Sequence, residues 1–293
     1  MEQPRSQVPF RPIFVGGTGR SGTTITAKLI AAHDEVFQTT PREVRFISLP
    51  KGVLDALSDQ CSPETTAENI LGPWFMRKKN SEYPVGLFQV ISDQELRSLT
   101  NRYLEEFKSD RWSSSRTLVE SIISNGKSLD EPKRWVDSTP QNVLRFSELL
   151  RLFPDARIVH VMRDGRDVAA SFVKKNFGPD DPLEALGLWH QRLIKAHEAQ
   201  LGADTRSILK INLADLVTQQ RVATLERLMK FLDLDLSQDV IEWFESEVTL
   251  ESAHVGRWSD EFSDRISREL NSRYEKMLTE LVPLGAYLPA NAE

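Results

Sequence analysis

A short apolar run followed directly by a glycine-rich segment constrains the fold of this chain more than any other feature. Ile13-Phe14-Val15 leads into Gly16-Gly17-Thr18-Gly19-Arg20-Ser21-Gly22, and the pattern beyond it predicts a helix from Thr23 to about residue 32. β-Branched and aromatic residues favour a buried strand, and glycines allow the backbone to turn tightly. The sequence therefore predicts a strand, a tight loop and a helix in succession.

This loop has the composition of an anion-binding turn. Glycines let several backbone N–H groups face one anion, and the N-terminus of the following helix adds its own N–H groups and dipole. The spacing from Gly17 to Gly22 matches the start of a nucleotide P-loop, but Thr23 stands where that motif has its lysine. The cation is Arg20 instead, and three hydroxyl side chains accompany it, those of Ser21, Thr23 and Thr24. A phosphate or sulfate group suits this loop better than a magnesium-bound nucleoside triphosphate. The alternative is a glycine turn that serves only tight packing.

Strands and helices alternate in the second half of the chain. Strands are predicted at residues 134–137, 157–162 and 207–211. Helices are predicted at residues 142–153, 167–175, 182–201, 218–232 and 266–281. Before them, the stretch up to residue 131 has helical patches such as residues 93–107 and 118–123, and Pro63, Pro73 and Pro84 interrupt it. This predicts a helical insertion at about residues 45–131 without a sheet of its own. We expect one α/β domain over residues 1–293, with a P-loop-like parallel sheet flanked by helices and a C-terminal loop and helix at about residues 252–285.

A second group of polar residues follows the strand predicted at residues 157–162. Arg163 comes directly after that strand, and Ser171 lies in the next helix. Ligands of parallel sheets bind beyond the carboxyl ends of the strands, and a guanidinium with a hydroxyl suits one phosphate group. The alternative is a salt-bridged turn in which Arg163 or Arg166 pairs with Asp164 or Asp167. Two anion sites after separate strands indicate a ligand with two separated anionic ends.

Charge and composition exclude several other classes of protein. The chain has 37 Lys and Arg against 43 Asp and Glu, a formal net charge of −6, which argues against general binding to nucleic acid or to anionic membranes. Cys61 is the only cysteine, so a disulfide within the chain and a multi-cysteine metal site are excluded. No histidine pair has zinc-binding spacing, and we expect no metal. The sequence shows no secretory signal and no membrane-spanning run, so we expect a cytoplasmic protein. It does not indicate an oligomeric state.

These segments resemble the PAPS-dependent sulfotransferase family. Residues 17–24 look like the family's loop for the 5′-phosphosulfate, and residues 163–171 look like its 3′-phosphate motif, with Arg163 and Ser171 at the matching positions. Gly256-Arg257-Trp258 is similar to a Gly-Arg-Trp element of bacterial members. Within the family, the motifs are closest to tyrosylprotein sulfotransferases and to bacterial small-molecule and carbohydrate sulfotransferases.

The resemblance implies a reaction and a set of site residues. PAPS would be the sulfuryl donor and PAP the product, with a small-molecule, glycan or peptide acceptor. The implied nucleotide-binding residues are Gly19, Arg20, Ser21, Gly22, Thr23, Thr24, Arg163, Ser171 and Arg257. Arg20 would also act in catalysis at the leaving phosphate, and Glu43, two residues before Arg45, would be the general base. An exposed ion pair in a loop is the alternative for Glu43, and a loop pinned by a buried Trp258 is the alternative for Arg257.

Two departures from the family pattern keep other functions open. Ser138 stands where the family often has a lysine, and Leu213-Ala214 replaces its usual Tyr-Glu. The first departure favours a protein that binds PAP or PAPS without turnover. A P-loop nucleotide kinase or other NTPase is the second alternative, which Thr23 disfavours. Among the histidines, His190 is a weaker rival for the base, and His197 and His254 offer no firmer case. His33 is assigned to a helix end and His160 to the core.

Overall fold

The computed structural model of the chain describes residues 11–79, 83–125, 134–202 and 204–289. The end of the predicted insertion, at residues 126–131, lies outside the described residues. Five strands form one sheet in the order β2-β5-β1-β6-β7. Their bounds are β1 Arg11–Gly17, β2 Val36–Gln38, β5 Arg134–Asp137, β6 Arg157–Met162 and β7 Ile208–Asn212. The pairs β2–β5 and β6–β7 are parallel, and the predicted α/β fold with a parallel sheet is confirmed.

The contacts within the chain define two compact units. The first unit takes in the described residues of Met1–Ile13, Asp34–Asp137 and Glu148–Arg157. The second takes in those of Phe14–His33, Ser138–Ser147 and Ile158–Glu293. The single domain over residues 1–293 stays a prediction.

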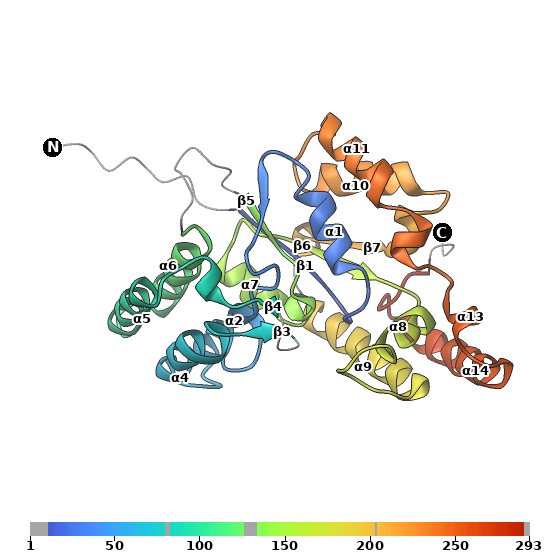
Figure 1. The fold of residues 1–293 in the computed structure, drawn as a ribbon, viewed down its shortest axis with the longest axis horizontal. Helices are drawn as coiled ribbons and strands as arrows, with labels where there is room; N and C mark the ends of the chain where they lie inside the picture. Colours follow the sequence, from blue (N-terminus) through green and yellow to red (C-terminus); the bar gives the residue numbers. More distant parts are fainter. Residues whose placement is uncertain (1–10, 80–82, 126–133, 203, 290–293) are drawn as a thin grey trace. The chain divides into compact units, whose positions relative to one another are not determined.

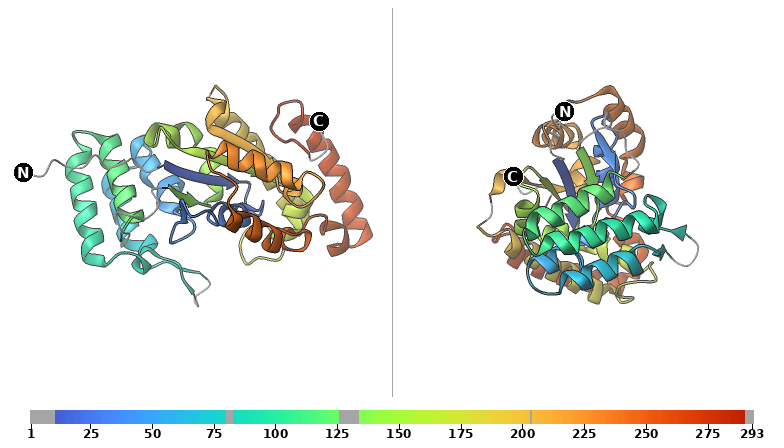
Figure 2. Two further views of the ribbon diagram at one scale, coloured as in Figure 1. Left: turned by 90° about the horizontal axis from the view of Figure 1, so that it is seen from above. Right: turned by 90° about the vertical axis from the view of Figure 1, so that its left-hand side faces the viewer.

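The first unit contains most of the predicted helical insertion. Its elements are α2 Arg45–Ser48, α3 Val53–Leu57, α4 Pro63–Asn69, η1 Ile70–Trp74, β3 Lys78–Lys79, β4 Tyr83–Pro84, η2 Leu87–Gln89, α5 Asp93–Phe107 and α6 Arg111–Ile123. Helix α5 has the predicted bounds, and Ser92 begins it with a capping box to Glu95. The patch predicted at residues 118–123 is the second half of α6, which lies beside α5 (Figure 2). The prediction that this insertion has no sheet of its own was wrong, since β3 and β4 form an antiparallel pair; strands of two residues leave no pattern of alternation.

The second unit carries helices on both sides of β6 and β7. Figure 1 shows α1, α10 and α11 on one side of these strands and α8, α9 and α14 on the other. The helices are α1 Thr23–Ile30, α8 Gly165–Phe172, α9 Pro182–Gln200, α10 Arg221–Phe231, α11 Gln238–Glu247, α12 Leu250–Ala253, α13 Trp258–Glu261 and α14 Asp264–Leu281, and 3-10 turns lie at η3 Pro140–Leu144, η4 Thr205–Ser207 and η5 Leu213–Leu216.

Several predicted helix bounds need correction. The segment predicted as one helix at residues 142–153 is the turn η3 followed by α7 Phe146–Leu152. Helix α8 begins at Gly165, before the predicted residue 167, because the Asp164 carboxylate accepts the N–H of Arg166 and caps the helix there. Helix α10 begins at Arg221 rather than at residue 218, because the hydroxyl of Thr218 donates to the carbonyl of Ala214 within the preceding turn.

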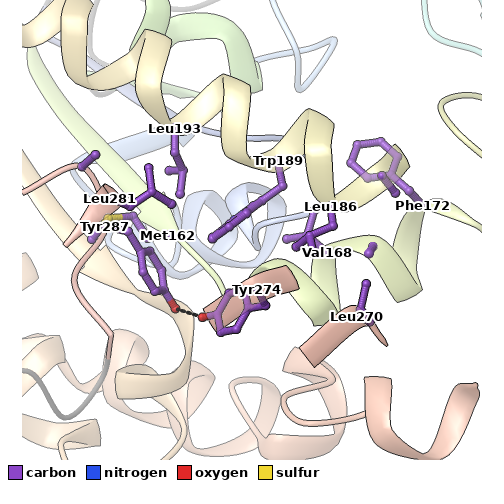
Figure 3. Packing of buried hydrophobic residues seen from close by; sticks show 13 residues of the cluster. Met162, Val168, Phe172, Leu186, Trp189, Leu193, Leu270, Tyr274, Leu281 and Tyr287 are labelled. Atoms are coloured by element: carbon purple, nitrogen blue, oxygen red, sulfur yellow. Dashed lines mark hydrogen bonds between the residues drawn. The ribbon is translucent and has the colours of Figure 1, made fainter. Parts of the chain in front are cut away.

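A buried aromatic cluster ties the core of the second unit to the end of β6. Trp189 of α9 packs against Tyr274 and Tyr287, with ring centroids 5.4 and 5.5 Å away (Figure 3). Its indole N–H donates to the carbonyl of Arg163 at 3.1 Å. A Cβ at Gly165 would lie 2.6 Å from the Trp189 ring, so only glycine fits this close approach. The core therefore fixes the backbone of the arginine that follows β6.

His160 in β6 gives this core a dependence on pH. Burial, and secondarily the charge of Lys210, lowers the pKa of His160 to about 3, whereas an unfolded histidine titrates near 6.5. As the pH falls below 6.5, His160 becomes protonated in the unfolded chain but stays neutral in the folded chain. This lowers the free energy of unfolding. Between pH 7 and pH 5 we expect this group to remove about 2 kcal/mol. Urea titrations of wild type and His160→Asn at both pH values measure it, and parallel pH profiles for the two proteins would contradict it.

Candidate active site

The loop between β1 and α1 is built to face an anion. Gly19, Arg20 and Gly22 adopt left-handed backbone conformations, with φ of 82°, 58° and 98°. No side chain caps α1, and its first turn holds no acidic residue. The N–H groups that begin this helix are therefore not capped by a side chain, which fits a bound phosphate or sulfate. The buried hydroxyl of Ser21 makes no hydrogen bond within the described part of the chain.

Close contacts hold this loop in place. A Cβ at Gly17 would lie 2.5 Å from the carbonyl oxygen of Val161, so the loop approaches β6 at a distance that only glycine permits. The guanidinium of Arg192, from α9, donates to the carbonyl of Thr18 at 2.5 Å. Arg163 donates to the carbonyl of Arg20 at 2.9 Å. The loop is thus held by contacts with other parts of the same unit.

The two predicted anion sites meet in one pocket of the second unit. Nε of Arg20 donates to Oγ of Ser171 at 2.9 Å, although the two residues lie 151 positions apart. Both belong to a pocket of about 210 Å³ that Arg163 and Arg257 also line. The full lining is Arg20, Arg163, Asp167, Ala170, Ser171, Lys174, Lys175, His254, Arg257 and Glu261. Five of these are Arg or Lys and two are acidic, so the pocket is cationic within an acidic chain. Gly19, Ser21, Gly22, Thr23 and Thr24 lie in the loop and helix start next to Arg20 but are not among the lining residues.

Arg163 is a buried cation that donates hydrogen bonds to two segments distant in the sequence. Its side chain donates to the carbonyls of Arg20 and His254, at 2.9 and 2.6 Å, while its Nε has no hydrogen-bond partner among the described residues. Burial lowers the pKa of the Arg163 guanidinium, Asp167 opposes that shift, and the charge of Arg20 adds to it. Guanidinium nevertheless stays protonated in proteins. A buried cation with an unused donor fits an anionic ligand.

The predicted alternative of a salt-bridged turn holds for Arg166 but not for Arg163. Arg166 pairs with Asp164 at 2.6 Å and lies over the rings of Trp258 and Tyr274. Asp167 accepts the N–H groups of Gly256 and Trp258, at 2.8 and 3.2 Å.

The Gly-Arg-Trp element places Arg257 at the pocket, while Trp258 is half-buried rather than buried as the alternative supposed. Half-buried Trp258 is held by Arg166, whose guanidinium lies 4.4 Å from the ring centroid. The preceding Arg257 lines the pocket. Trp258 therefore anchors the turn that places Arg257 at the pocket.

Asp167 and Ala170 lie within the motif at residues 163–171 but were not predicted as site residues, and four more pocket residues lie outside the motifs. These four are Lys174, Lys175, His254 and Glu261. One of them carried a local signal, since Glu261 follows Arg257 by four residues, the spacing at which helical side chains share a face. Glu261 pairs with Lys174 at 2.6 Å and with Arg257 at 2.7 Å. Burial opposes ionisation of Glu261, but these hydrogen bonds and charges outweigh it and lower the pKa of its carboxyl.

Glu43, the predicted base, belongs to the first unit. Its side chain is 31% exposed and accepts a hydrogen bond from Nε of Arg45 at 2.6 Å, so the predicted ion pair is present. The carboxylate of Asp137, at the end of β5, accepts the N–H of Val44 at 2.7 Å and orients this short segment. The segment is therefore ordered by the carboxyl end of a strand of its own unit, and the role of Glu43 stays a prediction.

Three further observations concern Ser138, metal ligands and membrane-spanning helices. Ser138 is buried in the second unit at the position where the resemblance leads one to expect lysine. In the part of the chain that the structure describes, no three His, Cys, Asp or Glu side chains are arranged to hold a metal ion. Among the same residues, no helix combines the length and the apolar character needed to cross a membrane.

Comparison with known proteins identifies the family. A sequence model of the sulfotransferase family matches residues 12–238. This chain therefore belongs to the sulfotransferase family, as its motifs predicted.

Solved structures share the fold. The sulfotransferase domain of a Synechococcus PCC 7002 olefin synthase is 15% identical, with 98% of this chain and 99% of that chain covered and a TM-score of 0.52. The sulfotransferase domain of the curacin biosynthetic pathway is also 15% identical, with 94% and 99% covered and a TM-score of 0.51. Mouse sulfotransferase SULT7A1, solved in complex with PAP, is 13% identical, with 96% and 92% covered and a TM-score of 0.50.

One curated relative extends beyond this chain. An uncharacterised protein of Aquifex aeolicus (strain VF5) is 24% identical over 281 residues, which cover 94% of this chain and 32% of the relative. The chain thus spans about a third of the length of that relative.

Proposed function

We propose that this sulfotransferase takes its sulfuryl group from PAPS and transfers it to a hydroxyl or amine of a small-molecule, glycan or peptide acceptor. The observation that carries the proposal is the hydrogen bond from Arg20 to Ser171 in a pocket that Arg163 and Arg257 also line. The loop around Arg20 suits the 5′-phosphosulfate, and the other three residues suit the 3′-phosphate. PAP bound to mouse SULT7A1, which has a similar fold, supports this choice of nucleotide.

The proposed reaction needs an acceptor placed in line with the bond that breaks. The acceptor oxygen or nitrogen forms a bond to sulfur while the bond from sulfur to the 5′-phosphate oxygen breaks, and negative charge develops on that phosphate. Arg20 and the N–H groups of the loop stabilise this charge because they are held in position beforehand. The carboxylate of Glu43 receives the proton of the acceptor.

Thermal denaturation with PAP, and separately with ATP and magnesium, tests the proposed nucleotide. A ligand at 100 times its Kd stabilises the folded state by about 2.7 kcal/mol, so PAP is expected to raise the Tm clearly. ATP with magnesium is expected to leave the Tm unchanged, because Thr23 replaces the lysine that triphosphate-binding loops use. Stabilisation by ATP with magnesium alone would favour the kinase alternative and reject the proposal.

Ser138 favours a second candidate, a protein that binds PAP or PAPS without turnover. The buried hydroxyl supplies no positive charge where the resemblance leads one to expect lysine. Release of PAP from PAPS in the presence of an acceptor library separates the two functions. A protein that binds PAP but forms none from PAPS with any hydroxyl or amine acceptor would support the second candidate. The cytoplasmic location stays a prediction.

A further inference from the structure

One carboxylate oxygen in the pocket collects three hydrogen-bond donors. Oε1 of Glu261 lies 2.6 Å from Nζ of Lys174 and 2.7 and 2.9 Å from Nη2 and Nε of Arg257. The other oxygen, Oε2, is buried and has no hydrogen-bond partner among the described residues. An unsatisfied buried carboxylate oxygen is unfavourable. A phosphate group, with three oxygens, would accept from the same donors without leaving this defect.

Glu261 is also the acidic residue that faces the cations of this pocket. The second acidic lining residue, Asp167, is already engaged with the N–H groups of Gly256 and Trp258. The Glu261 side chain is 14% exposed, and Arg163 and Ser171 line the same pocket. The carboxylate of Glu261 therefore lies where cationic side chains and a hydroxyl are gathered around one space.

We infer that Glu261 is an internal counter-ion of this pocket and that the 3′-phosphate of the bound nucleotide replaces it on Lys174 and Arg257. The inference rests on the proposed function for the identity of the phosphate. Glu261 then sets the affinity and selectivity for nucleotides with a 3′-phosphate, because each such ligand must displace a carboxylate from its cations. Lys174 becomes a phosphate-binding residue when the carboxylate leaves.

The segment that carries Glu261 is suited to release it. Helix α13 has four residues, no side-chain cap at its N-terminus and no buried residue. Glu261 is the last residue of this helix, and its partner Lys174 lies just beyond the end of α8. Trp258 fixes the start of α13 on Arg166 and Asp167, so exchange of the carboxylate for a phosphate needs only a movement of the Glu261 and Lys174 side chains.

Isothermal titration of wild type and Glu261→Gln with PAP tests the inference. Removing the competing charge is expected to tighten PAP binding by about tenfold. Adenosine 5′-phosphosulfate, which lacks the 3′-phosphate, is expected to gain less than about twofold, because it does not compete with Glu261. Asp260→Asn is the matched control, since it removes an exposed charge next to Glu261 that does not line the pocket.

The outcomes separate this inference from the proposed function. Weaker PAP binding in Glu261→Gln would mean that the carboxylate holds Lys174 and Arg257 in position, and equal gains in Glu261→Gln and Asp260→Asn would mean a general charge effect. Either result overturns the inference while wild-type PAP binding upholds the function. Failure of wild type to bind PAP rejects both.

Hydrogen exchange on wild type supplies a readout that needs no variant. Loss of the ion pairs of Glu261 is expected to speed amide exchange at residues 259–262 when PAP binds, since these pairs hold the end of α13 while Trp258 stays bonded to Asp167. Unchanged or slower exchange there would overturn the inference.

Discussion

Glu43→Gln is expected to lower kcat for sulfuryl transfer by about 10²–10⁴-fold while the Kd for PAP stays unchanged. The amide has the size of the carboxylate but does not accept the acceptor's proton. Glu43 does not line the pocket, so the variant should still bind the nucleotide. Release of PAP from PAPS measures kcat, and isothermal titration measures the Kd.

The matched control for this variant is Glu105→Gln, which removes an exposed carboxylate from α5 of the same unit. It should retain the activity of wild type. Full activity in Glu43→Gln would leave Glu43 with its ion pair to Arg45 as its only role. A parallel loss of PAP binding would indicate that the substitution disturbs the fold instead.

Arg20→Gly is expected to lower kcat by about 10²–10³-fold without destabilising the protein. Arg20 holds a left-handed backbone conformation that glycine adopts at no cost, which offsets the lost hydrogen bond to Ser171. The free energy of unfolding should therefore stay within about 1 kcal/mol of wild type. Urea titration and the PAP-release assay measure the two effects independently.

Asp233→Gly is the control for Arg20→Gly. Asp233 also has a left-handed backbone, with φ of 53°, and does not line the pocket. It should keep full activity. If Arg20→Gly retains activity, the loop amides alone stabilise the leaving phosphate. If its free energy of unfolding falls by several kcal/mol, the Arg20 guanidinium is primarily structural.

The parts of the fold that the sequence predicted best are those with strong local patterns. Strands β5 and β6 and helix α5 have the predicted bounds, because continuous apolar runs and a capping box mark their limits. Strand β2 was missed because three residues carry too little periodicity. The first half of α6 was missed because it is rich in serine, although Asp110 caps it.

The site was predicted where one segment carried a complete motif. Arg20, Arg163, Ser171 and Arg257 belong to such motifs, and the structure brings all four to one pocket. The pair of Lys174 with Glu261 joins residues 87 positions apart, and no local pattern indicates which distant charges will meet. The same limit applies to His254, whose carbonyl accepts from Arg163.

Helix α9 holds two loops of the pocket through side chains close together in its sequence. Trp189 holds the carbonyl of Arg163, and Arg192, one helical turn later, holds the carbonyl of Thr18. The two side chains are three residues apart, a rise of about 4.5 Å along the helix, so one short stretch of α9 holds both loops. A residue inserted or deleted between these two side chains would rotate one anchor away from its loop, so this stretch has less freedom to change in length than the surface connections around it.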